Sequence, residues 1–273
     1  MSVAATASSR ITPREPPRRH TEPAPGDRTP TLEAVWASDE ADVQAAQRLR
    51  WQVFAEEMGA AIASGSGAAP GLDVDAFDAH CEHLLVRTVA TDDEPARLVG
   101  TYRLLMPDGA RRAGGWYTAT EFDIGPLAPL SGSMVELGRS CVAAGFRSGG
   151  VILMLWASLG QFMHRRRVAT VMGCSSIPMH DGGVNAAAVW RTLSRTHLAP
   201  EHLRVRPRLP LPVDRLQAAP SAELPPLIKG YLRCGGKVLG PPAWDPAFRC
   251  ADLPMLLRWD ELSPSYRRHF VAG

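Results

Sequence analysis

Blocks of apolar residues, separated by polar and glycine-rich stretches, divide the chain into predicted strands and helices. Apolar runs of strand length occupy residues 31–37, 82–90, 97–106, 134–142, 168–174 and 253–259. Apolar residues at helical spacing occupy residues 39–58, 151–167, 184–198 and 227–233. An acidic turn over 91–95 joins two of the strands into a hairpin, and strands alternate with helices in the middle of the chain. This order predicts an α/β fold in which a mixed sheet carries helices on both faces.

The start of the chain differs from the rest. Residues 1–30 are rich in Pro, Arg, Ser, Thr and Ala, which predicts a disordered N-terminal tail. Residues 31–273 then form one predicted domain. Ser38 is placed to cap the helix over 39–58. Small residues and glycines over 60–71 predict a flexible loop after that helix.

Two later segments have weaker patterns. Residues 116–124 predict irregular structure or a short strand. Over residues 203–209, arginines alternate with apolar residues, which predicts a strand with one basic face. Because Pro207 has no N–H to donate to a neighbouring strand, this strand is expected at the edge of a sheet.

Residues 134–156 carry the strongest chemical signal. They predict a buried strand, a basic glycine-bearing turn and an apolar helix. Glu136 and Arg139 lie in the strand, where a charge is costly unless it is paired or used. The turn directs backbone N–H groups to the positive end of a helix dipole, an arrangement that binds phosphate. A phosphate site beside a strand carboxylate indicates a transferase that holds a phosphate-bearing carrier and deprotonates a nucleophile.

Composition and charge exclude other classes of protein. The 273 residues are 45% hydrophobic and 21% charged, and a net charge of +2 gives no basic excess for nucleic-acid binding. The five cysteines form no C-x-x-C pair, so we expect a reducing compartment and no metal site. The N-terminus lacks the apolar core of a signal peptide, and the apolar run over 151–163 is too short to span a bilayer. We therefore expect a cytoplasmic protein and leave peripheral contact with the inner membrane open.

Several longer motifs add a family resemblance. They are residues 50–60 (RWQVFAEEMGA), 77–78 (FD), 83–86 (HLLV), 100–105 (GTYRLL), 121–124 (EFDI), 136–142 (ELGRSCV) and 225–233 (PPLIKGYLR). In this order they resemble the L-ornithine Nα-acyltransferases of bacterial ornithine-lipid synthesis, a branch of the Gcn5-related N-acyltransferase (GNAT) superfamily. The resemblance implies the GNAT fold, with a mixed and mostly antiparallel sheet.

The resemblance also implies a reaction. A 3-hydroxyacyl group passes from acyl carrier protein to the α-amino group of ornithine, which attacks the thioester directly and gives lyso-ornithine lipid. No cofactor is then bound permanently, because the 4'-phosphopantetheine of the acyl carrier protein serves as the donor arm. The expected partners are acyl carrier protein and ornithine.

Site residues follow from the residue chemistry and the resemblance together. Glu136 is the expected base, acting directly or through a water, with Arg139 beside it as a second catalytic residue. An oxyanion donor is expected from a backbone N–H near Cys141 or Val142, in a strand bulge. The donor phosphopantetheine is expected on Val142, Arg147, Ser148, Gly149 and Gly150. The acceptor is expected on Arg50, Phe54, Asp75, Asp78 and Arg103, with the arginines on its carboxylate and the aspartates on its side-chain ammonium.

Alternatives stay open at this point. An acyl-homoserine lactone synthase has related residues at these positions and performs the same chemistry with S-adenosylmethionine as acceptor. A non-catalytic domain that binds acyl carrier protein or lipid is the alternative from another class. Cys141 as a covalent nucleophile is a further alternative, which predicts ping-pong kinetics, although no histidine partner for it is evident.

Overall fold

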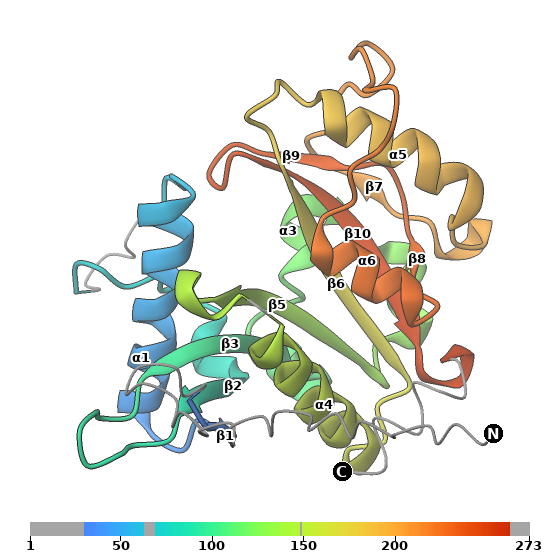
Figure 1. Ribbon diagram of the computed structural model, residues 1–273. Helices are drawn as coiled ribbons and strands as arrows, with labels where there is room; N and C mark the ends of the chain where they lie inside the picture. Colours follow the sequence, from blue (N-terminus) through green and yellow to red (C-terminus); the bar gives the residue numbers. More distant parts are fainter. Residues whose placement is uncertain (1–29, 63–68, 148, 263–273) are drawn as a thin grey trace, which may run out of the picture. The chain divides into compact units, whose positions relative to one another are not determined.

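A mixed β-sheet organises the chain (Figure 1). The computed structural model describes residues 30–62, 69–147 and 149–262. The chain divides into two units, Met1–Pro30 and Thr31–Gly273, and the second contains the helices and strands reported below. Apart from Pro30, the predicted N-terminal tail lies outside the described residues.

Among the described residues, eight strands form the main sheet in the order β1-β2-β3-β5-β6-β10-β8, with β9 also paired to β10. The strands are β1 Leu32–Trp36, β2 Cys81–Thr88, β3 Leu98–Leu105, β4 Phe122–Asp123, β5 Met134–Val142, β6 Thr170–Pro178, β7 Arg206–Pro207, β8 Lys237–Val238, β9 Ala243–Asp245 and β10 Cys250–Arg258. Neighbouring strands of the main sheet are antiparallel except for β5 and β6, which are parallel. The expected mixed, mostly antiparallel sheet is confirmed.

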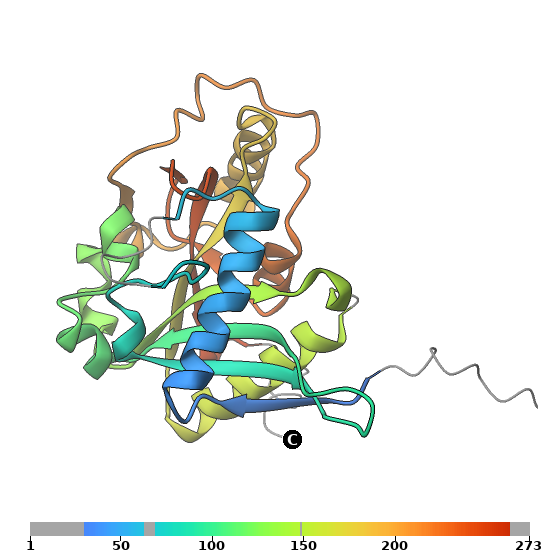
Figure 2. The same ribbon diagram turned by 90° about the vertical axis from the view of Figure 1, so that its left-hand side faces the viewer.

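Helices lie on both faces of this sheet. They are α1 Glu40–Trp51, α2 Pro107–Arg112, α3 Thr118–Glu121, α4 Gly150–Arg165, α5 Val184–Thr196 and α6 Pro226–Arg233, with a π-helix over Gln52–Glu57. The helix α1 crosses one face of β2, β3 and β5, whereas α4 covers β1, β2 and β3 from the opposite face (Figures 1 and 2). The sheet is therefore buried between layers, which explains its long apolar runs.

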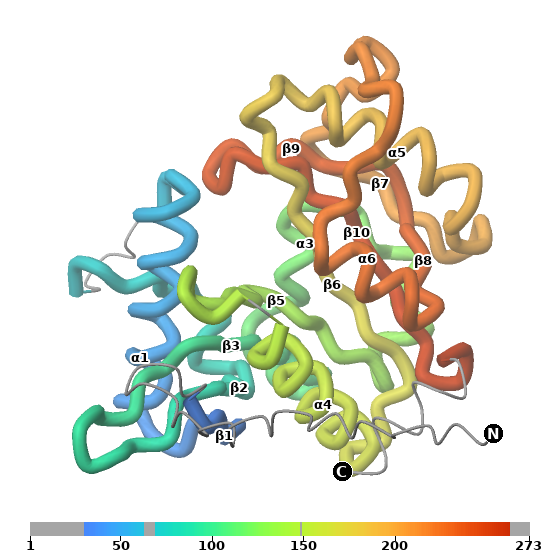
Figure 3. The backbone as a smooth tube through the Cα atoms, in the orientation of Figure 1, coloured from blue at the N-terminus to red at the C-terminus, as the bar shows by residue number. Residues whose placement is uncertain are grey.

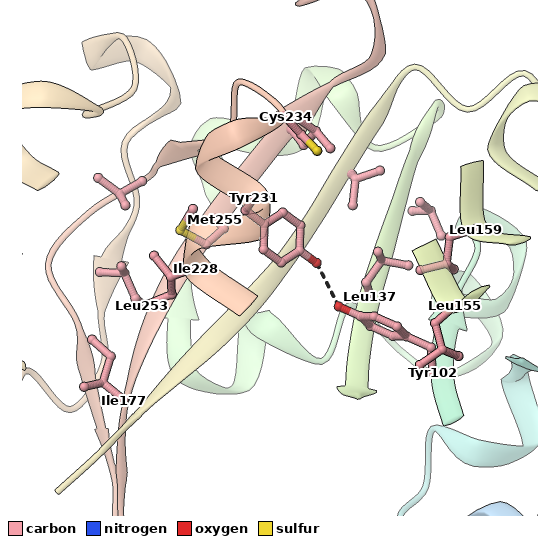
Figure 4. Packing of buried hydrophobic residues seen from close by; sticks show 14 of the residues in the cluster. Tyr102, Leu137, Leu155, Leu159, Ile177, Ile228, Tyr231, Cys234, Leu253 and Met255 are labelled. Atoms are coloured by element: carbon pink, nitrogen blue, oxygen red, sulfur yellow. Dashed lines mark hydrogen bonds between the residues drawn. The ribbon is translucent and has the colours of Figure 1, made fainter. Parts of the chain in front are cut away.

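The alternation of side chains along the strands separates the core into clusters. Val135, Val171 and Leu253 belong to the cluster that packs under α4, α5 and α6. Their neighbours Met134 and Met172 point the other way, into a smaller cluster. In the larger cluster, the hydroxyls of Tyr102 and Tyr231 meet at 3.0 Å, so both buried phenols have a polar partner (Figure 4).

The parallel strands β5 and β6 stay together over only part of their length. Their pairing runs from Met134 and Thr170 to Glu136 and Met172, and the strands separate after that point (Figure 3). Gly173 lies at the point of separation, where a β-carbon would come within 2.4 Å of the carbonyl oxygen of Leu137. Glycine thus lets the backbones approach closely before they part. The separated strand ends leave room for a site in the middle of the sheet.

Several predicted elements are confirmed. The strand predicted at the start of residues 134–156 is Met134–Val142, and the hairpin is formed by β2 and β3. The apolar helix begins at Gly150, one residue before the predicted start at 151. The strand predicted over 168–174 extends to Pro178, and the strand predicted from 253 begins at Cys250.

Other predictions were wrong in detail. Asp39, and not Ser38, caps α1, because its side chain accepts a 2.9 Å hydrogen bond from the N–H of Asp42. The helix predicted over 39–58 changes to a π-helix at Gln52. Neither of these features follows from apolar spacing, since that spacing reports a buried face and not the hydrogen-bond pattern within it.

The segments around β4 and β7 also differ from the prediction. Residues 116–124 contain the helix α3 as well as the short strand β4. The strand predicted over 203–209 is reduced to Arg206–Pro207, which pairs with β4 outside the main sheet. Leu203 belongs to a 3₁₀ turn and is buried in the second core cluster. The first residue of the predicted strand therefore packs as part of a turn and not as part of a strand. The helix α2, whose first residue is Pro107, was not predicted.

Among the described residues, no helix combines the length and apolarity needed to cross a lipid bilayer.

Candidate active site

A cavity of about 480 Å³ lies where the ends of β5 and β6 separate. Its lining includes residues of the π-helix after α1, the strands β3, β5 and β6, the helix α3, and the strands β9 and β10 with the segment between them. Among the expected site residues, those in the lining are Phe54, Arg103, Glu136, Arg139, Val142 and Arg147. The size of the cavity suits a small-molecule site.

Glu136 lies in the wall of this cavity, at the last position where β5 pairs with β6. The residue is 4% exposed. Its carboxylate accepts hydrogen bonds from the backbone N–H groups of Tyr117 and Thr118, at 2.7 and 2.6 Å, and from the Thr118 hydroxyl. Three donors at the start of α3 therefore hold this carboxylate in one orientation.

These contacts tune the acidity of Glu136. Burial raises its pKa, and the hydrogen bonds from Thr118 and Tyr117 and the charge of Arg103 lower it. The net effect is a raised pKa. A buried carboxylate with a raised pKa is a stronger base than an ordinary glutamate and accepts a proton more readily near neutral pH.

No ion pair explains the burial of this charge. Within the described part of the chain, Glu136 has no arginine, lysine or histidine nitrogen within 4.0 Å of its carboxylate. Its hydrogen-bond partners are the uncharged donors of Tyr117 and Thr118. The carboxylate is therefore fixed without being neutralised, as a proton acceptor requires.

A β-bulge follows Glu136 in the same strand. Gly138 pairs with Arg103 and Cys141 with Thr101, so Arg139 and Ser140 together face the single residue Tyr102. Arg139 has a φ of 51°, a left-handed conformation that is strained for a residue with a side chain. The expected bulge is therefore present, two residues before Cys141, and its residues line the cavity.

Arg139 extends from the bulge between two aromatic rings. Its guanidinium carbon lies 4.9 Å from the ring centre of Tyr117 and 4.6 Å from that of Phe248. Its Nη1 donates to the Tyr117 hydroxyl at 3.2 Å. Stacking and hydrogen bonding fix this arginine at the cavity wall, beside the turn that holds Glu136.

The charged residues expected to bind the acceptor are brought together, but they pair with one another. The network alternates arginines with aspartates and consists of Arg50, Arg103 and Arg139 with Asp73, Asp75 and Asp78. Within it, Arg50 is fully buried and contacts Asp73 and Asp78 at 2.8 Å. Three positive and three negative charges cancel, so the network as a whole is neutral.

The network lies only partly at the cavity. Arg103 and Arg139 line the cavity, while Arg50, Asp75 and Asp78 lie behind them. Phe54 lines the cavity from the π-helix and meets the ring of Phe248 edge to face at 5.7 Å. π-helical turns are frequent at functional sites, and this one lines the cavity.

The residues expected to hold the donor lie at one side of the cavity and just beyond it. Arg147 lines the cavity, and its Nε donates to the Val142 carbonyl at 3.0 Å while its guanidinium pairs with Glu57. Gly149 has a φ of 113°, which favours glycine, and precedes the first turn of α4, where Gly150 begins the helix. Ser148 lies outside the described residues.

The end of the cavity near β9 and β10 is acidic, and none of its residues was among the predicted site residues. Glu121, Asp245 and Asp252 line this end. Asp252 is 5% exposed and accepts a 2.6 Å hydrogen bond from the Ser176 hydroxyl. Burial and the neighbouring charges of Asp252 and Asp245 raise the pKa of Glu121 to about 9. These three carboxyl groups therefore share one acidic region, which we call the acidic end of the cavity.

One signal in the sequence pointed to this region. Asp252 is the only charged residue in the apolar run Ala251 to Leu257, as Glu136 is conspicuous in its own strand. A charge in an apolar strand is costly unless it is paired or used, and this holds for Asp252 as it does for Glu136. By contrast, Tyr117 and Thr118 lie in a segment with no clear periodicity, and nothing in the sequence indicates that they hold Glu136.

A family comparison agrees with this geometry. Residues 49–157 match the family described as Acetyltransferase (GNAT) domain. The matched range begins at Leu49 in α1, ends at Ala157 in α4, and includes the strand β5 that carries Glu136. The match therefore covers the proposed base and the turn before α4.

Curated relatives match nearly the whole chain. The L-ornithine N(alpha)-acyltransferase of Rhizobium meliloti is 34% identical over 90% of this chain and 86% of its own length. The protein of the same name from Rhodobacter capsulatus is 33% identical over 86% of this chain and 93% of its own. A solved structure, that of the acyl-homoserine lactone synthase LasI, is 13% identical with a TM-score of 0.48, over 90% of this chain and 97% of that one. That likeness is too remote to assign a function. The chain belongs to the L-ornithine Nα-acyltransferase family, has the GNAT fold, and is an acyltransferase.

Proposed function

We propose that this protein transfers a 3-hydroxyacyl group from acyl carrier protein to the α-amino group of ornithine, giving lyso-ornithine lipid. The names of its relatives support ornithine as the acceptor. The observation that carries the proposal is Glu136, a buried carboxylate fixed by three donors in the wall of a cavity. Acyl transfer to an amine needs a proton acceptor of this kind.

Glu136 is the proposed base. The neutral α-amine attacks the thioester carbonyl, so a C–N bond forms and the carbonyl oxygen becomes an oxyanion. The ammonium proton passes to Glu136, directly or through a water. Collapse of the intermediate breaks the C–S bond, and the departing thiolate takes up the proton that Glu136 accepted, which regenerates the base. The raised pKa of Glu136 favours the first proton transfer.

The bulge in β5 is the proposed source of the oxyanion donor. In a bulge the extra residue leaves the strand ladder, so its backbone N–H is available to a ligand. The bulge at Arg139 and Ser140 lines the same cavity as Glu136. A preorganised N–H at this position stabilises the oxyanion without any rearrangement during the reaction.

The donor arm is proposed to lie along the side of the cavity formed by the end of β5. Its phosphate contacts Arg147 and the backbone around Gly149 and Gly150, and its chain passes Val142. The first turn of α4 supplies free N–H groups and the positive end of a helix dipole. Because the arm arrives on the acyl carrier protein, the reaction needs no permanently bound cofactor.

Two arginines are proposed to act on the acceptor. Arg103 and Arg139 line the cavity, where they can contact an acceptor carboxylate. The ion-pair network outside the cavity lining holds these two arginines in place through Arg50, Asp75 and Asp78. Phe54 forms an apolar part of the wall.

The test is release of free thiol from 3-hydroxyacyl–acyl carrier protein, with ornithine, other amino acids and S-adenosylmethionine offered in parallel. We expect release that depends on ornithine and that Glu136→Gln reduces at least about 100-fold, the effect of losing a general base. Glu82→Gln is the matched control, because Glu82 is half-exposed and does not line the cavity.

Other outcomes separate the alternatives. Release with S-adenosylmethionine alone would identify a signal synthase. No release with any acceptor, from protein shown to be folded, would contradict the acyl transfer and favour a binding role.

A further inference from the structure

The acidic end of the cavity contains buried carboxyl groups that lack a cationic partner. The Glu121 Oε2 atom is buried and has no hydrogen-bond partner among the described residues. Asp252 is 5% exposed, and within the described part of the chain neither residue pairs with a cation within 4.0 Å. Buried carboxyl groups without a cation are costly, so this arrangement is suited to a positively charged ligand.

Strand register places this acidic end in the same cavity as the base, four residues farther along β6. Glu136 lies opposite Met172 of β6, while Asp252 lies opposite Ser176, farther along the same strand. Cys174 lies between these two positions, and its Sγ is 3.7 Å from the Thr118 hydroxyl. Thr118 in turn holds Glu136. A ligand that reaches from Glu136 to Asp252 therefore crosses Cys174 within one cavity.

A second cavity of about 300 Å³ adjoins the acidic end. Its lining includes Glu121 and Asp245, which also line the first cavity. Asp245 and Asp252, together with Cys250, offer ligand atoms within 4.8 Å of one another. Glu121 and Asp245 thus lie where the two cavities meet, and the carboxyl groups of Asp245 and Asp252 are close enough to contact one small cation.

We propose that Glu121, Asp245 and Asp252 bind the side-chain ammonium of the acceptor, and so select an amino acid with a second amine. This inference rests on the proposed function. Asp75 and Asp78, which the sequence suggested for this role, are already paired with Arg50, Arg103 and Arg139.

The acidic end has no such arginine partners among the described residues, and a bound ammonium would stabilise the ionised form of its carboxyl groups. The choice of acceptor then depends on two amines, one at each end of the acceptor molecule. The α-amine lies at Glu136, and the side-chain amine lies at Asp252.

Equilibrium binding tests this inference independently of turnover. Ornithine and norvaline, which lacks the side-chain amine, are titrated by calorimetry into the full-length protein and into Asp252→Asn and Glu121→Gln. We expect wild-type protein to bind ornithine more tightly than norvaline. Each variant should weaken ornithine binding about 10- to 100-fold, the usual effect of losing one charged hydrogen bond, and leave norvaline binding unchanged. Asp252→Asn keeps an oxygen for the Ser176 hydroxyl, and exposed Asp214→Asn is the matched control.

Three outcomes would overturn the inference. The first is equal affinity of the wild-type protein for ornithine and norvaline, and the second is equal weakening of both ligands in the variants. The third comes from a parallel titration with Zn²⁺, if Asp252→Asn abolishes zinc binding but leaves ornithine binding unchanged. Thiol release, measured on the same proteins, decides the proposed function separately. If wild-type protein releases thiol with ornithine and Asp252→Asn loses no selectivity, the acyltransferase assignment stands and this inference fails.

Discussion

Thr118 holds the carboxylate of Glu136 through two of its own groups. Its backbone N–H donates to Glu136 Oε1 at 2.6 Å, and its hydroxyl donates to the same oxygen. Both residues are buried, and one comes from the helix α3 while the other comes from the strand β5. A short helix thus positions the proposed base and sets its acidity.

Thr118→Val should move the pH dependence of acyl transfer. The hydroxyl lowers the pKa of Glu136, so its removal raises that pKa further above its ordinary value. Because the base must be deprotonated, the acid limb of kcat/KM should shift to higher pH. A pH–rate profile measures the shift. Thr196→Val, which removes an exposed hydroxyl from α5, is the control. A loss of rate with an unmoved acid limb would contradict the role of this hydroxyl.

Cys141→Ser should keep most of the activity. Cys141 lines the cavity, but burial raises the pKa of its thiol to about 12, so the thiolate needed for covalent catalysis is scarce at neutral pH. Steady-state rates and intact-protein mass spectrometry check this expectation. Cys234→Ser, a buried position outside the cavity lining, is the control. An acyl–enzyme adduct that Cys141→Ser abolishes would establish ping-pong transfer instead.

Gly149→Ala should destabilise the start of α4. The φ of 113° at Gly149 is unfavourable for alanine and should cost about 1–2 kcal/mol of unfolding free energy. Urea unfolding measures this cost, and the KM for acyl carrier protein should rise because the turn carries the proposed phosphate contacts. Gly145→Ala is the matched control, since Gly145 has open space and no positive φ. Equal stability of the two variants would contradict this account.

Asp78→Asn should destabilise the protein strongly. Asp78 accepts hydrogen bonds from Arg50 and Arg103 within the buried network. Removing its charge leaves buried arginines uncompensated, at an expected cost of about 3–5 kcal/mol. Urea unfolding is again the measurement. Asp108→Asn, which breaks an exposed pair with Arg111, should have little effect. Similar losses in the two variants would argue against a structural role for the network.

The same network gives a pH dependence of stability. Burial raises the pKa of Asp78, but the hydrogen bonds and charges of Arg50 and Arg103 outweigh it and lower the pKa below its ordinary value. A lowered folded-state pKa stabilises the fold above the unfolded value and loses this contribution as the pH falls toward the folded value. Unfolding free energy, measured in urea at a series of pH values, should therefore decrease below about pH 4. The decrease should be smaller in Asp78→Asn, and an equal decrease would point to other carboxyl groups.

Sequence alone was sufficient for most elements and for one catalytic candidate. Apolar periodicity located the hairpin, the strand β5 and the helix α4, because each pattern is local and reports the buried face of one element. Glu136 stood out for the same reason, as a charge in an apolar strand. The order of the longer motifs indicated the family.

Only the tertiary structure decided which charges are neutralised. Arg50 and Asp78 are far apart in the sequence, and their pairing depends on how α1 packs against the segment before β2. The separation of β5 and β6 likewise brings Asp252, from the last strand, into the cavity of Glu136. Periodicity within one element does not report contacts between elements, and the charge of a site is the sum of such contacts.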